Sequence, residues 1–157
     1  MPEAGKLLKL RPMNLPATTF PPNTSDLLAS LCKAGGDPLR LQILRALVND
    51  SFGVLELSKI FATGQSGISH HLKVLAQAGL VATRREGNAI FYRRALACSE
   101  AFGGSLHAAL LDEVDALPIA ADVQRRTGDV HAQREAASRD FFARMANSFQ
   151  AQTELPA

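Results

Sequence analysis

The sequence predicts a mainly α-helical fold with one small β-hairpin, and three observations support this. Apolar residues recur at helical spacing through most of the chain after residue 23. Two short β-like runs, 81–85 and 89–94, are joined by Glu86-Gly87-Asn88, residues that favour a tight turn. The chain has 157 residues, 46% of them apolar and 20% charged, which is typical of one compact domain with appendages.

Residues 1–23 contain five of the eight prolines and show no lasting periodicity, so we expect an extended N-terminal arm. No apolar h-region follows the basic residues of this segment, and no apolar run approaches the roughly 20 residues that cross a bilayer. We therefore expect a cytoplasmic protein without a membrane segment. Two cysteines, Cys32 and Cys98, are too few for a disulfide framework.

Two helices are expected at the start of the folded region. Asn23 is a candidate cap for the first, which carries the leucines at 27, 28 and 31 and ends at Gly35-Gly36. Asp37-Pro38 is typical of an N-cap followed by the first helical residue, because proline lacks an N–H that would be unpaired there. Apolar residues at 41, 44 and 48 continue the second helix, which we expect to end near Asp50.

The next two helices are shorter and are separated by Thr63-Gly64. The third carries Leu57, Ile60 and Phe61 on one face. In the fourth, residues 65–78, the apolar positions 68, 72 and 75 lie on one face, and the opposite face is wholly polar. Gly79 is well placed to end it.

After the hairpin, two further helical patterns are expected. An apolar stripe at 102, 106, 110, 114 and 117 ends at Pro118, which closes a folded unit over residues 24–118. Residues 119–157 are expected to form a linker and a C-terminal amphipathic helix over 129–152, with Phe142, Met145 and Phe149 on one face. That helix has no obvious place in the preceding core, so its apolar stripe needs a partner.

Two short helices with a small-residue turn, followed by a basic hairpin, are typical of a winged helix-turn-helix. Residues 63–94 contain five Lys and Arg but a single Glu, which favours a polyanionic partner. For the polar helix face alone, a solvated surface is the alternative interpretation. The four hairpin arginines beside it, with a single glutamate among them, would repel one another without an anionic partner, so they favour binding to double-stranded DNA. The expected contacts are Gln65, Ser66, Ser69, His70, Lys73, Arg84, Arg85, Asn88 and Arg93.

Several motifs resemble one known family. Residues 65–75 (QSGISHHLKVL), 78–81 (AGLV), 84–87 (RREG) and Phe91-Tyr92 closely resemble the recognition helix and wing of the ArsR/SmtB family of bacterial repressors, and 37–44 (DPLRLQIL) resembles its second helix. The resemblance covers about residues 25–97. It implies an ArsR-like winged helix that forms a homodimer through its first helix and the helix after the wing. It also implies repression at a palindromic operator, relieved by a small-molecule or redox effector.

The sequence departs from the metal sensors of that family. Their arsenic and cadmium site needs two cysteines near the third helix, where this chain has 53–57 (GVLEL). His107, Asp112 and Asp115 lie where zinc sensors of the family hold ligands. However, His107 and Asp112 point about 140° apart around a helix, so they do not converge on one ion. We expect surface residues there, and neither a metal nor another cofactor.

Cys32 and Cys98 fall in two regions that should meet near the dimer contact. A thiol switch is one interpretation, because redox sensors of this family use two cysteines. Their first cysteine, however, belongs in the second helix, where this chain has Arg45. We therefore favour burial of both cysteines as small apolar residues.

Two alternatives to a complete repressor remain open. Residues 134–144 resemble the linker that leads, in some larger family members, into a methyltransferase-like domain, so the chain could be the DNA-binding regulatory part of such a protein. It could instead be a protein-interaction winged helix. We find no glycine-rich nucleotide loop and no grouping of nucleophile, base and orienting carboxylate, so we expect no enzyme activity from this chain.

Overall fold

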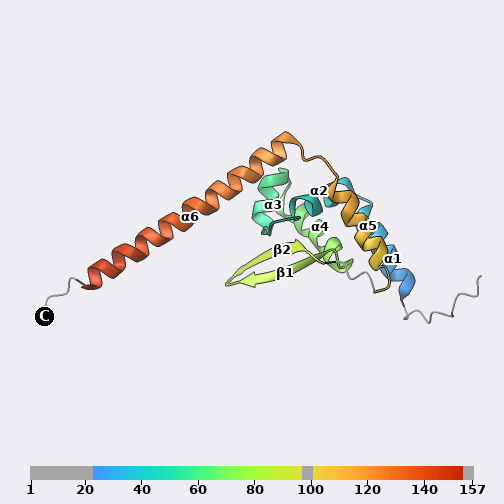
Figure 1. Cartoon of the computed structure of the whole chain (residues 1–157), viewed down its shortest axis with the longest axis horizontal. Helices are drawn as coiled ribbons and strands as arrows, with labels where there is room; N and C mark the ends of the chain where they lie inside the picture. Colours follow the sequence, from blue (N-terminus) through green and yellow to red (C-terminus); the bar gives the residue numbers. More distant parts are fainter. Residues whose placement is uncertain (1–22, 97–100, 154–157) are drawn as a thin grey trace, which may run out of the picture.

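A computed structural model describes residues 23–96 and 101–153 of the chain, so residues 1–22 of the expected arm lie outside it. Six helices and a two-stranded antiparallel sheet make up the described part (Figure 1), which confirms the predicted fold class. The elements are α1 (Thr24–Gly35), α2 (Pro38–Ala46), α3 (Val54–Phe61), α4 (Gln65–Gln77), β1 (Val81–Glu86), β2 (Ala89–Arg94), α5 (Gly104–Asp115) and α6 (Ala121–Thr153). None of these helices is both long and apolar enough to span a membrane.

The junction between α1 and α2 is fixed by polar contacts at both helix ends. Asp37 caps α2 as predicted, accepting a hydrogen bond from the Arg40 N–H at 3.0 Å. The buried Arg40 guanidinium donates to the carbonyls of Lys33 and Ala34, at 2.7 and 2.9 Å, and so pairs the last carbonyls of α1. The prediction for Asn23 is wrong, because its side chain makes no capping hydrogen bond.

The core lies among α2, α3, α4 and the root of the hairpin. Helix α2 ends at Ala46, earlier than predicted, because the chain turns at Leu47 to bring Leu47 and then Phe52 into the core. The fully buried large side chains are Ile43, Leu44, Leu47, Phe52, Leu57, Ile60, Ile68, Leu72, Leu75, Leu80 and Val114. Burial of this many large apolar groups is the main stabilising term of the fold.

The predicted hairpin forms, with Glu86 as the last residue of β1 and not part of the turn, and it is anchored at its root. Gly87 follows β1 at φ 58°, whereas Asn88 has no positive φ, which is the pattern of a two-residue turn with glycine first. Phe52 and Tyr92 exchange two backbone hydrogen bonds, at 2.9 and 3.1 Å. Because Phe52 is buried, this bridge fastens the wing to the segment just before α3.

Helix α5 is shorter than the apolar stripe predicted. It begins after Phe102 and ends at Asp115, and its buried side chains are Leu111 and Val114, whereas Leu106 is 41% exposed. Helices α1 and α5 run side by side (Figure 1), where the Leu110 side chain lies against Gly35. Leu110 and Val114 of the expected stripe thus pack as predicted, whereas Leu106 is exposed and Leu111 is buried in its place.

Helix α6 corrects the expectation of a C-terminal helix with no place in the core. It begins at Ala121 rather than near residue 129, and its first half packs on α3. Val130 is buried, and the Arg126 Nε donates to the Ile60 carbonyl at 2.6 Å. The second half projects from the body (Figure 1), with Phe142 67% exposed.

Candidate nucleic-acid interface

Helix α4 has one apolar face and one polar face, as the sequence predicts. Ile68, Leu72 and Leu75 are fully buried, which fixes how the helix is rotated on the core. The opposite face is exposed at Gln65, Ser66, Ser69, His70 and Lys73. These are short or flexible polar side chains with donors and acceptors suited to base edges and phosphates.

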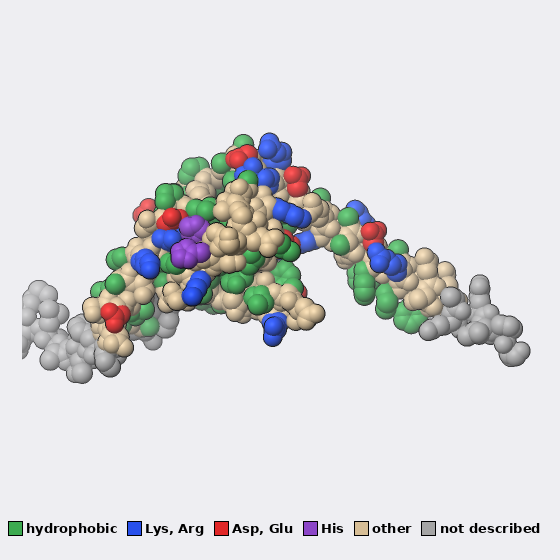
Figure 2. Space-filling view, turned by 180° about the vertical axis from the view of Figure 1, so that it is seen from behind, with side chains coloured by type: hydrophobic (Ala, Val, Ile, Leu, Met, Phe, Trp, Pro, Cys, Tyr) green, Lys and Arg blue, Asp and Glu red, His purple; other side chains and the backbone are tan. Residues whose placement is uncertain are grey.

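The two adjacent histidines of α4 differ in their surroundings. His70 is exposed, and its ring meets that of His71 edge-on at 6.0 Å between centroids. His71 is half-buried, with its Nδ1 lying 3.4 Å from the Arg40 Nη1 and 3.8 Å from the Asp37 Oδ1. His71 is thus part of the scaffold and not of the exposed polar face. Figure 2 shows histidine side chains together on one face of the body, with Lys and Arg side chains around them.

The hairpin arginines do not form a single surface. In the register of the sheet, Arg84 lies opposite Phe91 and Arg85 opposite Ile90, so these two arginines point to opposite faces. Arg93 shares the face of Arg84. Arg85 therefore lies on one side of the wing, and Arg84 and Arg93 lie on the other. Asn88 is exposed in the turn.

Two of the four arginines have acidic partners within the chain. The Arg84 Nη2 lies 2.5 Å from the Glu86 Oε1 in an exposed pair, and Arg94 pairs with Asp115 of α5. The expectation that these arginines would repel one another without an outside anion is therefore wrong for Arg84 and Arg94. Among the described residues, neither Arg85 nor Arg93 takes part in an ion pair.

Sequence reasoning missed a polar cluster that joins α6 to the start of α3. The Arg134 Nε and Nη2 donate to the two carboxylate oxygens of Glu56, each at 2.6 Å, and Nη2 also donates to the Ser51 carbonyl at 2.7 Å. The guanidinium lies over the rings of Phe52 and Phe91, at 5.0 and 5.8 Å. Helix α6 thus reaches the hairpin through one side chain.

Electrostatics within this cluster favour the charged pair. Burial alone would raise the pKa of the Glu56 carboxyl, but hydrogen bonds from Arg134 and from the Gly53 N–H outweigh it and hold that pKa below its ordinary value. The hydrogen bonds to Glu56 raise the pKa of the Arg134 guanidinium. No sequence signal pointed to the pair, because its members lie 78 residues apart.

The residues considered for a metal do not come together. Among the residues that the structure describes, no three His, Cys, Asp or Glu side chains form a group that could hold an ion. Asp115 is paired with Arg94. His107 has a buried Nε2 without a hydrogen-bond partner in the described part of the chain, and burial lowers the pKa of this imidazole, with a further decrease from Arg94.

The expectation of buried cysteines is wrong for Cys32. That thiol is free and exposed on α1. The first turns of α1 pack on the segment before α5 through Leu27 and Leu31, which lie near Gly103, and the Cys32 side chain points elsewhere. Cys98 lies outside the described residues.

Residues 37–83 match the family of bacterial regulatory proteins described as the arsR family. The transcriptional activator HlyU of Vibrio cholerae is 40% identical over 85 residues, covering 54% of this chain and 76% of its own length. The biofilm growth-associated repressor of Xylella fastidiosa is 41% identical over 66 residues, covering 42% of this chain and 58% of its own. A solved structure of HlyU from Vibrio cholerae covers 60% of this chain and 94% of its own, with 31% identity and a TM-score of 0.47. The chain belongs to the arsR family of bacterial regulatory proteins and is a DNA-binding transcriptional regulator.

Proposed function

We propose that the chain is a homodimeric repressor that places α4 in the major groove of a palindromic operator and is released by a small effector. The exposed polar face of α4, backed by three fully buried apolar side chains, is the observation that carries this proposal. A helix held in this way presents base-reading side chains without moving the core. Gln65, Ser66, Ser69 and His70 would select sequence, and Lys73 would contact phosphate.

The start of α4 supports a further phosphate contact. No side chain caps its N-terminus at Gly64, so no capping group occupies the first-turn N–H donors. A phosphate at that position would gain both hydrogen bonds and the favourable end of the helix dipole. Arg84, Arg85, Asn88 and Arg93 would add wing contacts to the backbone or the adjacent minor groove.

The surface formed by α1 and α5 supports the proposed dimer. Leu27 of α1 and Leu106 of α5 are 38% and 41% exposed, and the two helices pack against each other. Partly exposed leucines on adjacent helices are suited to a symmetric contact with a second copy. Such a dimer would present two α4 helices about 34 Å apart, one turn of duplex.

Footprinting on the DNA upstream of the gene for this protein tests the proposal. We expect two protected major-groove segments about one helical turn apart. Lys73→Glu should weaken binding at least about tenfold, because it places a negative charge on the face that meets phosphate. If Lys73→Glu bound the DNA with unchanged affinity, α4 would not be in contact with DNA.

Arg139→Glu is a matched control, since it reverses one exposed charge on the projecting part of α6. It should leave the affinity within about twofold. Equal losses in the two variants would indicate a general charge effect and not a contact through α4. A reporter gene placed behind the same DNA shows whether the protein represses or activates transcription. We expect expression of the reporter to rise when the gene for the protein is deleted.

A further inference from the structure

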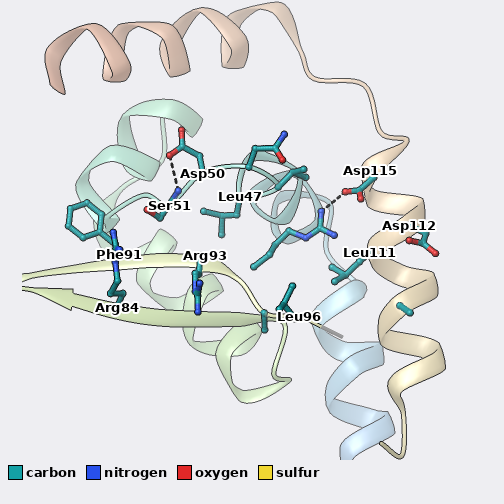
Figure 3. Close-up of a pocket in the computed structure, with 15 residues that line it drawn as sticks. Leu47, Asp50, Ser51, Arg84, Phe91, Arg93, Leu96, Leu111, Asp112 and Asp115 are labelled. Carbon is teal, nitrogen blue, oxygen red and sulfur yellow. Dashed lines mark hydrogen bonds and ion pairs between the residues drawn. The ribbon is translucent and has the colours of Figure 1, made fainter. Parts of the chain in front are cut away.

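An open cleft of about 670 Å³ lies between the face of the hairpin that carries Arg84 and Arg93, the segment after α2, and α5. Figure 3 shows Arg84 and Arg93 along the hairpin, with Leu47 and Leu111 on the other walls. The volume is within the range of sites that hold small organic molecules, about 300 to 1,000 Å³.

The walls of the cleft combine apolar surface with cationic groups. Apolar surface comes from three parts of the chain: Leu47 after α2, Phe91 of β2, and Ala108 and Leu111 of α5. The Arg134 guanidinium lies over the Phe91 ring, 5.8 Å from its centroid. Removal of an apolar ligand body from water against these side chains would favour binding.

Two of the three acidic residues that line the cleft form ion pairs within the described part of the chain. Of the acidic lining residues, Asp50 is paired with Arg134 and His131, and Asp115 is paired with Arg94. The Asp112 side chain points away from the hairpin (Figure 3).

Arg93, by contrast, has no ion-pair partner among the described residues. Arg84 has only the exposed Glu86, and exposed pairs contribute little. A guanidinium in this setting suits a carboxylate or sulfonate, which it can bind with two parallel hydrogen bonds.

We propose that this cleft binds an organic anion with an apolar body, with Arg93 and Arg84 holding the anionic group. The carboxylate or sulfonate lies at the hairpin edge, and the hydrocarbon part lies between Leu47 and Leu111. The cleft differs from the metal and thiol sites considered from the sequence, because its ligands are guanidinium groups and apolar walls.

A second step rests on the proposed function: the same ligand is the effector that releases DNA. Arg84 and Arg93 are proposed phosphate contacts, so an anion that occupies them removes two contacts from each subunit. The cleft also separates the hairpin from α5, and the Arg94–Asp115 pair joins these walls at their root. Loss of two contacts should reduce the salt dependence of DNA binding by a slope of about 1.8 for each subunit.

Titration with anilinonaphthalene sulfonate, an aromatic anion that fluoresces in apolar sites, tests the cleft in the full chain. Arg93→Gln removes the charge and leaves a shorter polar side chain, and it should weaken binding of the probe about tenfold or more. Ala108→Trp fills the cleft and should weaken binding of the probe by the same factor. Thermal melts of both variants establish that they fold. The neutral analogue N-phenylnaphthylamine should bind wild type more weakly than the anion.

Two controls locate the probe. Arg85→Gln removes the same charge from the opposite face of the hairpin and should leave the affinity within about twofold. Phe142→Ser disrupts the exposed stripe on α6 and should also change nothing. Equal affinities for Arg93→Gln and Arg85→Gln, or loss of binding in Phe142→Ser, would overturn the assignment of the cleft.

DNA binding in the presence of octanoate tests the release mechanism. Saturating octanoate should weaken DNA binding by wild type about tenfold and should leave binding by Ala108→Trp unchanged, whereas octanol should have no effect on either. An equal effect of octanoate on both proteins, or none on wild type, would contradict the mechanism. If neither protein binds DNA at all, the proposed function fails, while the probe titration still decides whether the cleft binds anions.

Discussion

Ser69 shows how one residue on α4 can read sequence without supporting the fold. It is exposed, while its neighbour Ile68 is fully buried. The hydroxyl can both donate and accept a hydrogen bond, so it suits several base edges. Its removal should therefore change which operator is preferred and leave the helix intact.

Ser69→Ala should shift the relative affinities for operator variants by about 1 to 3 kcal/mol at the base pair contacted. The expected result is a changed ranking of single-substitution operators in competition assays, with an unfolding temperature equal to wild type. Ser138→Ala, on α6 away from α4, is the control and should leave the ranking unchanged. An unaltered ranking in Ser69→Ala would show that this hydroxyl contacts no base.

Single residues were predicted from sequence where local spacing decides their role and were missed where tertiary contacts do. Asp37 caps α2 because a side chain three residues before an N–H needs no distant partner. Cys32 was expected to be buried because free cysteine usually is, but it lies on the exposed face of α1. The facing of Arg84 and Arg85 depends on strand register, which composition does not reveal.

At the scale of elements, α4, the hairpin and the existence of a C-terminal helix were predictable, whereas the start of α6 and its packing on α3 were not. Helix α4 has a strict apolar period between two glycines, and the hairpin has a turn sequence between two β-like runs. The docking of α6 depends instead on one buried apolar residue, Val130, and on Arg134, whose partners precede it by many residues. Such a contact leaves no periodic signal.

Glu56→Gln should make the free energy of unfolding lower by about 1 to 2 kcal/mol at neutral pH, because it removes the charge that Arg134 binds. The pKa of Glu56 is lower in the folded chain than its ordinary value of 4.5, so the stabilisation is present above that pH. It is lost as pH falls through the lowered folded pKa. Denaturant titrations from neutral to acidic pH measure this dependence.

The variant should therefore show a weaker fall in stability on acidification than wild type, and the two should converge at low pH. Glu135→Gln, a change of the same kind at an exposed position on α6, should follow the wild-type curve. If the free energy of unfolding of Glu56→Gln kept the full pH dependence of wild type, the charge of Glu56 would not stabilise the contact between α6 and α3.

Gly128 lies within α6, where a Cβ atom would meet nothing within 4 Å. Gly128→Ala should therefore stabilise the chain by about 0.5 to 1 kcal/mol, since alanine loses less backbone entropy in a helix. Thermal melts followed by circular dichroism would measure the gain. Gly79→Ala is the opposite case, because φ there is 72°, and it should destabilise the chain. A loss of stability in Gly128→Ala would show that this part of α6 is not a regular, open helix.

For the whole molecule, three surfaces are assigned to three tasks. We propose that the polar face of α4 and the wing arginines meet DNA, that the α1–α5 surface meets a second copy, and that the cleft behind the hairpin takes an organic anion that competes with DNA for Arg84 and Arg93. The helix order that sets the first two follows from the sequence. The cleft does not, because its walls come from the segment after α2, from β1 and β2, and from α5, and only folding brings these together.

The central claim is that the α4 face and the wing bind duplex DNA together, and the salt dependence of operator binding tests it most directly. The slope of log affinity against log salt concentration should be less steep in Arg85→Gln by about 0.9 for each subunit, with equal weakening on all sequences. Arg139→Gln, on the projecting part of α6, should keep the wild-type slope. A slope for Arg85→Gln equal to that of wild type would contradict the account, because the wing would then make no phosphate contact through this arginine.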